Sequence, residues 1–568
     1  MELKNIFRVS LVAAAVSLTA CGGDINVTPT VNDNSTTTND TSIGDNSPQT
    51  TYSGGATAPK ENPCASYGEK QGALTSEGHC LYSASFASQS IEIDEDITFA
   101  DLENDGVHVF DGALLIGKDA NTAEGQTINQ NGPTMTVEAG ATLAFKTGES
   151  IVRIARGAKI DAIGTFEKPI TFTSAKAFAE LDVVGLGAQF ADWGGIQING
   201  NAITDQCTDA ERTAATCNAK AEGITSYYGG NNNADDSGDM AYVNIFYAGS
   251  GPRTGGKGDD LNSLTINAVG SGSSFDYIHI HQGYDDGIEI FGGASTISHV
   301  VVTDTQDDAF DFDAGWQGKA QYLFVKHGTV NTVVDTQVLN AREGDDPSTT
   351  EVEGEDHEYF VTQVIPAGTP VNMGNNGFET DGRKDKSSTE VAATNPVISN
   401  VTVITTDGKS VRDEDPSQAF KFDDLVEGQY YNVLMVKADA TSGTECVEFK
   451  SDAVEAPVAD KLNFTTSVMA CAAEFKAGAG EMLGDSAETR EVWFENGGSN
   501  VRGVDGTTVL ADDGISADTD MITVTATDPT TLGSFFQAGS FVGAVDGTQT
   551  SSNWYKWVKQ AVATASND

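Results

Sequence analysis

Paired carboxylates recur at a fixed distance in the middle of the sequence. The segment 285–290 reads Asp-Asp-Gly-Ile-Glu-Ile, and 22 residues later the segment 307–312 reads Asp-Asp-Ala-Phe-Asp-Phe. If this offset is one repeat of a stacked structure, Asp286 lies beside Asp308 of the neighbouring repeat. Two carboxylates in adjacent repeats repel each other, and the repulsion raises the pKa of one of them toward the value that a general acid needs. We therefore expect one of the two to hold a proton at neutral pH.

The same repeats place a second set of polar side chains on one face of the predicted strands. In each strand the two apolar residues must point inward, so the residue between them points outward. Neighbouring strands lie about 4.8 Å apart, so outward carboxylates such as Glu289 and Asp311 either take up cations or raise their own pKa values. This outward ladder consists of Gln197, Glu289, Asp311, Glu379, Lys421 and Glu448.

Two interpretations of the ladder stay open. It is a hydrated acidic surface on a protein whose every face is acidic, or it is a calcium site, because calcium prefers hard oxygen ligands from carboxylates and loops. In the second case the bound ion could bridge the protein to an acidic polysaccharide. No complete calcium-loop motif accompanies the ladder in the sequence.

Three histidines lie near one another in the same repeats. His279 and His281 are two residues apart on one predicted strand and point outward, and His299 falls opposite position 277 in the next repeat. Three imidazoles at one place could bind a transition metal. Outward histidines also pack and hydrogen bond with their neighbours, so both interpretations stay open.

Short strands must position all of these side chains. After about residue 90 the sequence consists of short alternating apolar stretches separated by Gly, Asn and Asp, which indicates an all-β fold. The strand before each acidic pair keeps the same offset, and a period of this length is typical of one turn of a solenoid. Its apolar pairs are Ile278 with Ile280, Val300 with Val302, and Tyr322 with Phe324. Weaker copies of the acidic strand stand at 195–198, 377–380, 419–422 and 446–449.

The solenoid is expected to span residues 91–480, with two large insertions. They run from about 199 to 240 and from about 329 to 373, and a solenoid accepts such loops without disturbing its stack. Residues 481–568 are predicted to form a C-terminal cap. Their aromatic cluster around Trp554 and Trp557 is expected to cover the last turn, because an open end exposes strand edges and apolar surface.

The first residues predict export and a lipid anchor. A short basic region precedes an apolar run over 9–18, and the chain continues Leu-Thr-Ala up to Cys21. This pattern is typical of a secretory signal peptide, residues 1–20, that is cleaved before a cysteine to be lipidated. Cys21 would then carry two or more acyl chains, which is what stable anchoring requires. Residues 21–60 are rich in Thr, Asn, Asp and Ser and poor in large apolar residues, which predicts a disordered tether.

The remaining cysteines stand in near pairs along the chain. In an oxidising compartment, local pairing is the expectation, and no metal-binding spacing of cysteines is present. Residues 61–90 would form an N-terminal cap tied by the first pair. The predicted disulfides are Cys64–Cys80, Cys207–Cys217 and Cys446–Cys471.

The charge of the chain restricts its partners. The formal net charge is −51, which repels the phosphate backbone of nucleic acids and anionic headgroups and favours cations and basic partners. No apolar run after the signal peptide approaches the ~20 residues of a membrane helix. The sequence therefore excludes nucleic acid as a partner and predicts attachment to the membrane through the lipid alone.

Together, these features resemble the pectate-lyase-like β-helix superfamily, and more closely the surface lipoproteins of Gram-negative bacteria that combine a lipidated cysteine with this fold. The segments 137–143, 160–162 and 164–174 look like the early turns of such helices. The resemblance implies a right-handed parallel β-helix with N- and C-terminal caps. Because Gly22 and not Asp follows the cysteine, it also implies sorting to the outer membrane, with the cell surface favoured and the periplasmic face left open.

The acidic pairs are also similar to elements of inverting polygalacturonase-type hydrolases. In these enzymes an Asn-Thr-Asp-Gly element, an Asp-Asp element and a His-Gly element follow one another turn by turn. By that resemblance, Asp307 or Asp308 would protonate the glycosidic oxygen, and another carboxylate such as Asp286 would activate water. His327 would support the arrangement.

The sequence departs from that hydrolase pattern. Tyr284 and Asp285 replace the Asn-Thr pair, and no Arg-x-Lys follows in the next turn. A lyase fits less well than a hydrolase, because β-elimination needs a basic side chain and residues 276–328 contain no Arg.

Two functions follow from these observations. The leading hypothesis is a surface-anchored, non-enzymatic module that binds a polysaccharide or a partner protein of the outer membrane, and the resemblance to lipoproteins adds a role in nutrient uptake. The alternative is a polygalacturonase-like inverting hydrolase of polysaccharides. The outward ladder without a complete catalytic set favours the first, and the stacked acidic pairs favour the second.

Replacing Cys21 by Ser should abolish lipidation, because serine offers no thiol for the diacylglycerol. We expect the Cys21→Ser variant to lose metabolic labelling with a radioactive fatty acid and to leave the membrane fraction. Membrane association unchanged in this variant would show that another anchor exists.

Overall fold

The computed structural model describes residues 62–566, apart from residue 182 and the ranges 184–186, 251–260, 344–357, 384–393, 407–416, 439–444, 451–460 and 477–487. The chain divides into two units, Met1–Lys60 and Glu61–Asp568, and all described residues belong to the second. Cys21, the signal peptide and the tether lie outside the described residues.

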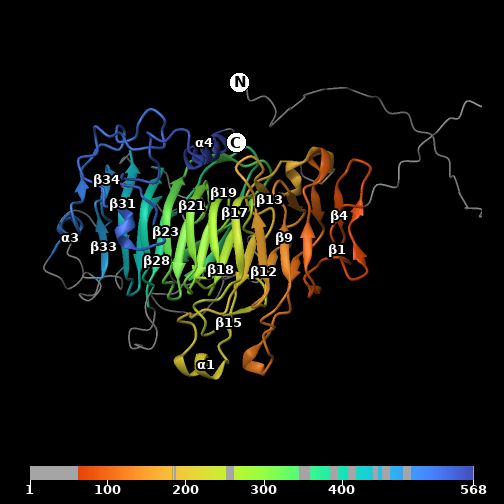
Figure 1. The fold of residues 1–568 in the computed structure, drawn as a ribbon. Coiled ribbons are helices and arrows are strands. Elements are labelled where there is room, and N and C mark those ends of the chain that lie inside the picture. The colour runs from red at the N-terminus through yellow and green to blue at the C-terminus, as the bar shows by residue number, and fades with distance from the viewer. Residues whose placement is uncertain are drawn as a thin grey trace, which may run out of the picture. The chain divides into compact units, whose positions relative to one another are not determined.

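Two large sheets contain most of the strands. The first, called sheet I here, has ten short strands, and each pairs in parallel with the next one in chain order. Figure 1 labels β18 and β28 of this sheet, and the colour of the whole stack runs from orange to blue along the chain. Sheet I consists of β5 (Glu92–Ile93), β8 (Leu114–Ile116), β11 (Val152–Ile154), β14 (Ile196–Asn199), β18 (Leu264–Asn267), β20 (Ile288–Phe291), β22 (Phe310–Asp313), β28 (Asn376–Asp381), β30 (Gln418–Asp423) and β32 (Val447–Phe449).

Sheet II has seventeen strands, and its pairs are parallel except for β3 with β4. Along the middle of the chain its strands alternate with those of sheet I, so that one strand of each sheet makes one repeat. Sheet II consists of β3 (Ala73–Leu74), β4 (Cys80–Tyr82), β6 (Ile97–Phe99), β7 (His108–Phe110), β9 (Thr134–Val137), β10 (Thr142–Phe145), β12 (Lys159–Ile163), β13 (Ile170–Ser174), β17 (Gly238–Phe246), β19 (Ser274–His281), β21 (Thr296–Thr303), β23 (Lys319–Lys326), β29 (Val397–Ile404), β31 (Gly428–Lys437), β33 (Leu462–Thr465), β34 (Val468–Cys471) and β35 (Val501–Arg502).

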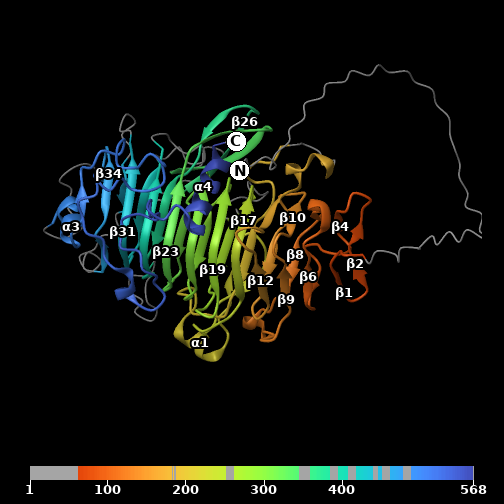
Figure 2. The same cartoon turned by 45° about the horizontal axis from the view of Figure 1, so that its top comes forward.

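Small hairpins and short helices lie outside the two large sheets. The β25–β26 hairpin stands at the top and α1 at the bottom of the stack in the view of Figure 2. The antiparallel hairpins are β1 (Ser66–Tyr67) with β2 (Lys70–Gln71), β15 (Ala219–Lys220) with β16 (Tyr227–Tyr228), β24 (Thr329–Asn331) with β27 (Pro370–Asn372), and β25 (Thr336–Glu343) with β26 (Glu358–Ile365). The α-helices are α1 (Asp209–Ala214), α3 (Arg490–Asn496) and α4 (Asn553–Ala565), and 3-10 turns span Glu103–Asp105, Thr122–Glu124, Ala175–Ala177, Ala179–Leu181 and Pro529–Leu532.

The apolar residues of both sheets face a shared core. Ile288 and Ile290 of sheet I and Ile278 and Ile280 of sheet II are completely buried in one cluster. Because the strands are parallel and in register, like residues stack on like, and Phe310 lies 4.8 Å from Phe378 between ring centroids. Offset stacking of this kind adds stability beyond the burial of apolar area. The predicted all-β class is therefore correct.

The 22-residue offset holds for two repeats and then changes. Ile278 lies opposite Val300, and Glu289 lies opposite Asp311. In the next repeat, however, Val300 lies opposite Leu323 and not opposite Tyr322, so the predicted third copy is wrong by one residue. The connection from β22 to β23 is one residue longer than that from β20 to β21. A shift by one residue exchanges the two faces of a strand, and Tyr322 consequently points away from the shared core.

A column of residues with positive φ bends the strands of sheet II. Its members occupy the same position in successive repeats, between two stretches of regular pairing, and Thr466 lies between β33 and β34. This left-handed conformation costs a non-glycine residue about 1 kcal/mol or more, so stacking and hydrogen bonds must stabilise it. The column consists of Tyr242, Tyr277, His299, Tyr322, Asn400, Asn432 and Thr466.

The last segment of the chain covers this column. Asn400 donates from Nδ2 to the main-chain oxygens of Gly539 (2.9 Å) and Phe541 (2.8 Å), and Tyr322 donates to Ala538 O at 2.9 Å. Figure 1 shows α4 beside β19 and β21 in the middle of the stack. There the Trp554 ring lies 5.2 Å from that of His299.

The expected cover of the last turn by Trp554 and Trp557 is therefore wrong. Both indoles pack on the outer face of sheet II, against Tyr277 among others. The stacked rings of Tyr277, His299 and Tyr322 offer an aromatic surface on which the Trp554 indole packs.

All three predicted disulfides are present in the described residues. The Cα atoms are 5.4 Å apart in Cys64–Cys80, 5.5 Å in Cys207–Cys217 and 6.1 Å in Cys446–Cys471, within the usual range for disulfides. Among the described helices, none is long and apolar enough to cross a membrane.

Replacing Asn400 by Asp should weaken the attachment of the last segment. The fully buried amide donates two short hydrogen bonds to carbonyl oxygens, and a carboxylate would oppose those oxygens while keeping the side-chain shape. We expect the free energy of unfolding to fall by about 2 kcal/mol or more, measured by chemical denaturation, and proteolysis to remove the C-terminal segment sooner.

Asn553→Asp is the matched control, because it makes the same change at an exposed residue of the C-terminal segment. The Asn553 amide donates to Tyr242 Oη at 3.3 Å. Equal stability of the two variants would contradict the role given to Asn400.

Candidate functional site

The outward side chains of sheet I form one continuous column. Gln197 of β14 lies opposite Thr265 of β18, and Thr265 lies opposite Glu289 of β20. The column then continues through Asp311, Glu379, Lys421 and Glu448. The structure thus brings the residues of the outward ladder together, with Thr265 as an additional member.

Carboxylates gather around this column in three groups that could each hold a metal ion. Within each group, one oxygen from every residue lies within 4.8 Å of the others. Two groups share Asp286, so the ligand atoms form a connected acidic surface. Among the described residues the groups are Asp285 with Asp286 and Asp307, Asp286 with Glu289 and Asp311, and Glu379 with Asp381 and Asp423.

In the group Asp286, Glu289 and Asp311, the strongest charge effects on Glu289 and Asp311 come from other carboxylates. Burial, followed by the carboxylates of Glu222 and Asp311, raises the pKa of Glu289 well above its usual range. Burial and then other carboxylates, with Asp381 first, do the same to the pKa of Asp311. Asp311 Oδ1 is buried and accepts no hydrogen bond within the described part of the chain. Raised pKa values and crowded carboxylate oxygens favour the uptake of protons or of a cation at this group.

Lysines compensate the charge at the other end of the column. Lys421 Nζ lies 2.6 Å from Glu379 Oε1, and Lys476 Nζ lies 2.8 Å from Glu448 Oε1. Burial acts to raise the pKa of Glu379, but the Lys421 ammonium and hydrogen bonds outweigh it and lower the pKa. The two ends of one column therefore differ in how their carboxylates are neutralised.

Asp308 lies next to Asp286 and is almost completely buried. Its backbone N–H donates to Asp286 Oδ1 at 3.0 Å, so the two carboxyl groups are neighbours as their 22-residue spacing predicts. Burial, then the charges of Glu379 and Asp307, raises the pKa of Asp308 well above its usual range. Asn376 donates to Asp308 Oδ1 from its backbone at 2.8 Å and from Nδ2 at 2.7 Å. The raised pKa favours the protonated form of Asp308, and the surroundings of Asp308 are an interior network of hydrogen bonds.

His327 is fixed in the interior as well. It is 3% exposed, and its ring nitrogens lie 3.5 Å from Thr305 Oγ1 and 3.4 Å from Ser417 Oγ. Burial, together with the nearby charge of Lys437, lowers the pKa of His327 to about 3. The imidazole is therefore neutral at physiological pH and packs between strands, where a substrate could reach it only after a rearrangement.

The three outward histidines do not form one metal site in the described structure. His279 and His281 both contact Thr303 Oγ1, at 3.1 Å and 2.8 Å. His299 instead stacks on Tyr277 and lies 2.7 Å from Asp276 Oδ1. Burial lowers the pKa of His279 well below its usual value. No group of described residues that could hold a metal contains a histidine, because the bend of sheet II turns His299 toward the tyrosines.

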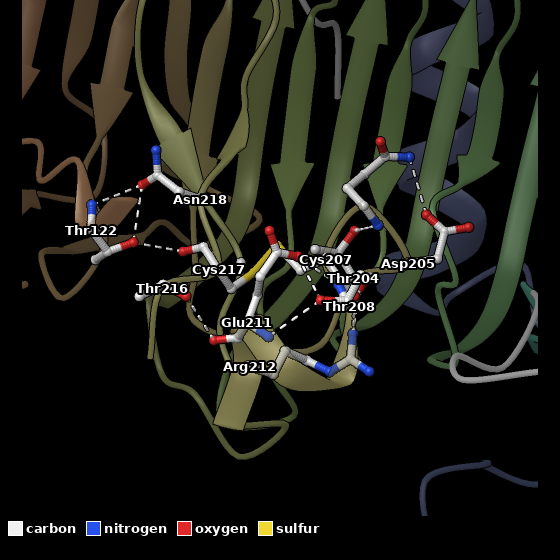
Figure 3. Close-up of a disulfide and its surroundings, with 12 residues drawn as sticks. Thr122, Thr204, Asp205, Cys207, Thr208, Glu211, Arg212, Thr216, Cys217 and Asn218 are labelled. Atoms are coloured by element: carbon white, nitrogen blue, oxygen red, sulfur yellow. Dashed lines mark hydrogen bonds between the residues drawn. A yellow bond between two sulfur atoms is a disulfide. The ribbon is translucent and has the colours of Figure 1, made fainter. Parts of the chain in front are cut away.

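A disulfide-tied loop covers the first part of the column. Figure 3 shows Cys207 and Cys217 joined beside α1, where Thr208 and Glu211 cap the helix reciprocally. The loop continues to Glu222, whose main-chain oxygen accepts a hydrogen bond of 3.0 Å from Gln197 Nε2. Gln197 is consequently fully buried and Glu289 is 7% exposed. Gln197 and Glu289 are thus covered by a loop, while Asp311, Glu379 and Lys421 are partly exposed.

Buried arginine contacts hold this loop against the stack. Arg156 donates to the carbonyl oxygens of Cys217 and Gly229, each at 3.0 Å, and Thr122 Oγ1 donates to Cys217 O at 2.8 Å, as Figure 3 shows. A buried guanidinium that donates several hydrogen bonds to carbonyls fixes their positions. The loop that carries Glu222 is therefore anchored at its base.

Sequence reasoning missed several residues of this site. Thr265 escaped because it precedes Glu289 by 24 residues and not 22, although Leu-Thr-Ile shows the right alternation. Asp381 and Asp423 lie opposite each other at the ends of β28 and β30, and the Asp after each Phe-x-Thr or Phe-x-Phe strand was the signal that could have found them. Nothing local to the sequence points to Glu222, because a long insertion brings it to the column.

Comparison with known proteins gives one match. Residues 111–353 match the family model described as a pectate-lyase like beta helix domain, so the chain is similar to that domain over a range that includes Asp286, Asp308 and His327. No curated protein and no solved structure matches the chain. The match agrees with the stacked parallel strands and is compatible with polysaccharide binding and with polysaccharide hydrolysis.

The buried acid Asp308 should make the metal-free protein less stable as pH rises. Its raised pKa means that the folded state keeps a proton that the unfolded state releases near pH 4. The stabilisation is fully present below that pH and is lost as pH rises through the folded-state pKa. We expect Asp308→Asn, which keeps the acceptor for Asn376, to reduce the loss of unfolding free energy between about pH 5 and about pH 8 by about 1 kcal/mol or more.

The measurement is denaturant unfolding in a chelator, because a bound cation would compensate the same charge. Asp505→Asn, at an exposed carboxylate of the C-terminal segment, serves as the control and should keep the wild-type slope. If Asp308→Asn keeps it too, Asp308 does not hold the proton.

Proposed function

We propose that this protein is an extracytoplasmic, lipid-anchored module that binds calcium on the outward column of sheet I and, through the ion, an acidic polysaccharide. The observation that carries the proposal is the group Asp286, Glu289 and Asp311, whose ligand oxygens lie within 4.8 Å of one another. Calcium takes several carboxylate oxygens in a flexible geometry and tolerates ligands from neighbouring strands. These residues fit such an ion by charge and by donor type.

The charges around the group support a cation over any other ligand. The neighbouring charges that act most on Glu289 and Asp311 are all carboxylates, while Lys421 forms an ion pair with Glu379 and Lys476 forms one with Glu448. A cation between the three carboxylates would offset repulsion that protons otherwise remove. An ion held by a few protein oxygens keeps open positions for the carboxylates of an acidic polysaccharide.

The fold supports binding along an extended ligand. We propose that the repeats, one strand of each sheet apiece, are turns of a right-handed parallel β-helix between an N-terminal cap at 61–90 and a C-terminal region at 481–568. The parallel register through the stack and the match to a pectate-lyase like beta helix domain both support it. Asp311 and Glu379, which are partly exposed carboxylates in adjacent strands of the column, are the acidic groups that such a ligand would approach.

The proposed cellular location is inferred from the first residues of the chain. The pattern ending at Cys21 favours a lipid anchor, and three disulfides fit an oxidising compartment. The outer membrane, with the body at the cell surface, is the location that the resemblance to Gram-negative lipoproteins suggests. A partner protein of the outer membrane is the alternative ligand.

Hydrolysis is the second candidate function, favoured by one observation. Asp308 carries a raised pKa beside Asp286, as a general acid in an inverting pair requires. Against it stand the burial of Asp308 and His327, each 3% exposed, and the hydrogen bonds from Asn376 that occupy Asp308. The binding module is therefore the better account of the geometry.

Titration with calcium alone tests the proposed site. We expect isothermal calorimetry to detect binding to the mature protein, and the double variant Glu289→Gln with Asp311→Asn to weaken it by about tenfold or more, since two charged ligands are lost. Glu448→Gln is the matched control, because this residue belongs to the same column but is already neutralised by Lys476. Equal losses in the control, or no binding of millimolar calcium by the wild type, would contradict the proposal.

The same proteins should then be tested with polygalacturonate and alginate. We expect binding that requires calcium and that fails in the double variant, with no new reducing ends. New reducing ends without unsaturated products, abolished in Asp308→Asn, would replace the binding proposal by the hydrolase.

A further inference from the structure

A groove lies in the C-terminal region, remote in sequence from the column of sheet I. Its volume is about 780 Å³, and residues between Ala511 and Tyr555 line it. The apolar part of the lining includes Ile522, Val524 and Phe541, which pack onto the outer apolar clusters of sheet II. The groove is therefore formed by the C-terminal segment that covers the bent strands of sheet II.

The polar lining of the groove is acidic. The charged residues that line it are Asp512, Asp513, Asp518 and Asp546. Lys559 lies beside the groove and donates to Asp513 O at 2.9 Å, and Tyr555 donates to Asp513 Oδ2 at 3.2 Å. Asp513 is thus held by its neighbours, while Asp512, Asp518 and Asp546 are partly or fully exposed.

We infer that this groove binds a short, basic and partly apolar peptide segment of another protein. The argument is charge complementarity over an apolar floor. Lysine and arginine side chains lay their aliphatic stems on apolar surface and keep the charged end among carboxylates, and leucine-like side chains between them would contact the floor residues. The volume lies within the range of sites for small ligands and short segments.

The apolar floor distinguishes binding in this groove from non-specific attraction of cations by the acidic chain. A net charge of −51 attracts any cation, but carboxylates alone do not favour an apolar side chain. A peptide that alternates Lys and Leu should therefore bind better than one that alternates Lys and Ser, although both carry the same charge. The proposal is independent of the calcium site, and its test is done in a chelator.

The C-terminal region offers a closely matched control for the groove carboxylates. Asp546 Oδ1 accepts from the backbone N–H of Thr548 at 2.9 Å and from its hydroxyl at 2.7 Å. Outside the groove, Asp505 Oδ1 accepts from Thr507 at the same two distances. Asn keeps the accepting oxygen in both turns, so each substitution removes one charge without removing the turn.

The experiment measures binding of a hexapeptide that alternates Lys and Leu to the mature protein by calorimetry. We expect the double variant Asp518→Asn with Asp546→Asn to weaken binding by about fivefold or more, and the control Asp505→Asn with Asp528→Asn to leave it within about twofold. The peptide that alternates Lys and Ser should bind at least about fivefold more weakly to the wild type. Unchanged thermal unfolding of both double variants shows that they are folded.

Other outcomes overturn the proposal. Equal weakening by the two double variants would show attraction to an acidic surface and not to the groove. Equal binding of the two peptides would remove the role of the apolar floor, and no binding of the Lys-Leu peptide at about 1 mM would exclude the site. Tighter binding of a glucosamine oligomer, lost in the groove variant, would give the groove to an amino sugar in place of a peptide.

Discussion

Parallel strands in register place like residues next to like, about 4.8 Å apart, and this constraint decides both the stability and the chemistry of the protein. For apolar residues the constraint is favourable, as the stacked rings of Phe310 and Phe378 illustrate. For carboxylates it is unfavourable, because Glu289 and Asp311 lie opposite each other with other acids around them. The core thus gains from the same repetition that forces like charges together on the outside of sheet I. Any function of the outward column must begin with how that repulsion is removed.

The repulsion between neighbouring carboxylates is reduced in different ways at different places along the column. Lys421 neutralises Glu379 directly, and at Asp308 burial and neighbouring charges raise the pKa and so favour the protonated form. At Glu289 and Asp311 the leading neighbouring charges are carboxylates, and within the described residues Asp311 Oδ1 accepts no hydrogen bond. The disulfide-tied loop increases the effect, since Glu222 adds a charge while the loop excludes water from Gln197 and Glu289. A bound cation would remove the repulsion of all three carboxylates at once, whereas protons would have to be taken up one by one.

The parts of the fold that follow the repetition could be predicted from the sequence, and the parts that depend on long-range contacts could not. Asp286 beside Asp308, and Glu289 opposite Asp311, follow from a constant 22-residue offset. Tyr322 was misplaced because one extra residue in a connection exchanges the faces of the next strand. The grouping of His279, His281 and His299 failed for a related reason, since the positive φ of His299 turns its ring toward Tyr277. The position of Trp554 depends on a surface that exists only after the tyrosines have stacked, so no local pattern points to it. Burial of the ladder is equally non-local, because an insertion supplies the cover.

The bend in sheet II gives the C-terminal segment its place and, with it, a second acidic surface of a different kind. Asn400 and Tyr322 hold the segment through its main chain, so its side chains remain available to line a groove. Carboxylates such as Asp546 are partly exposed there and accept hydrogen bonds within their own turns, whereas Glu289 is 7% exposed and crowded by other carboxylates. Ionised groups over an apolar floor attract an organic cation, whereas buried and crowded oxygens suit a small metal ion without an apolar part. One acidic composition therefore supports two chemically distinct sites, and what separates them is burial.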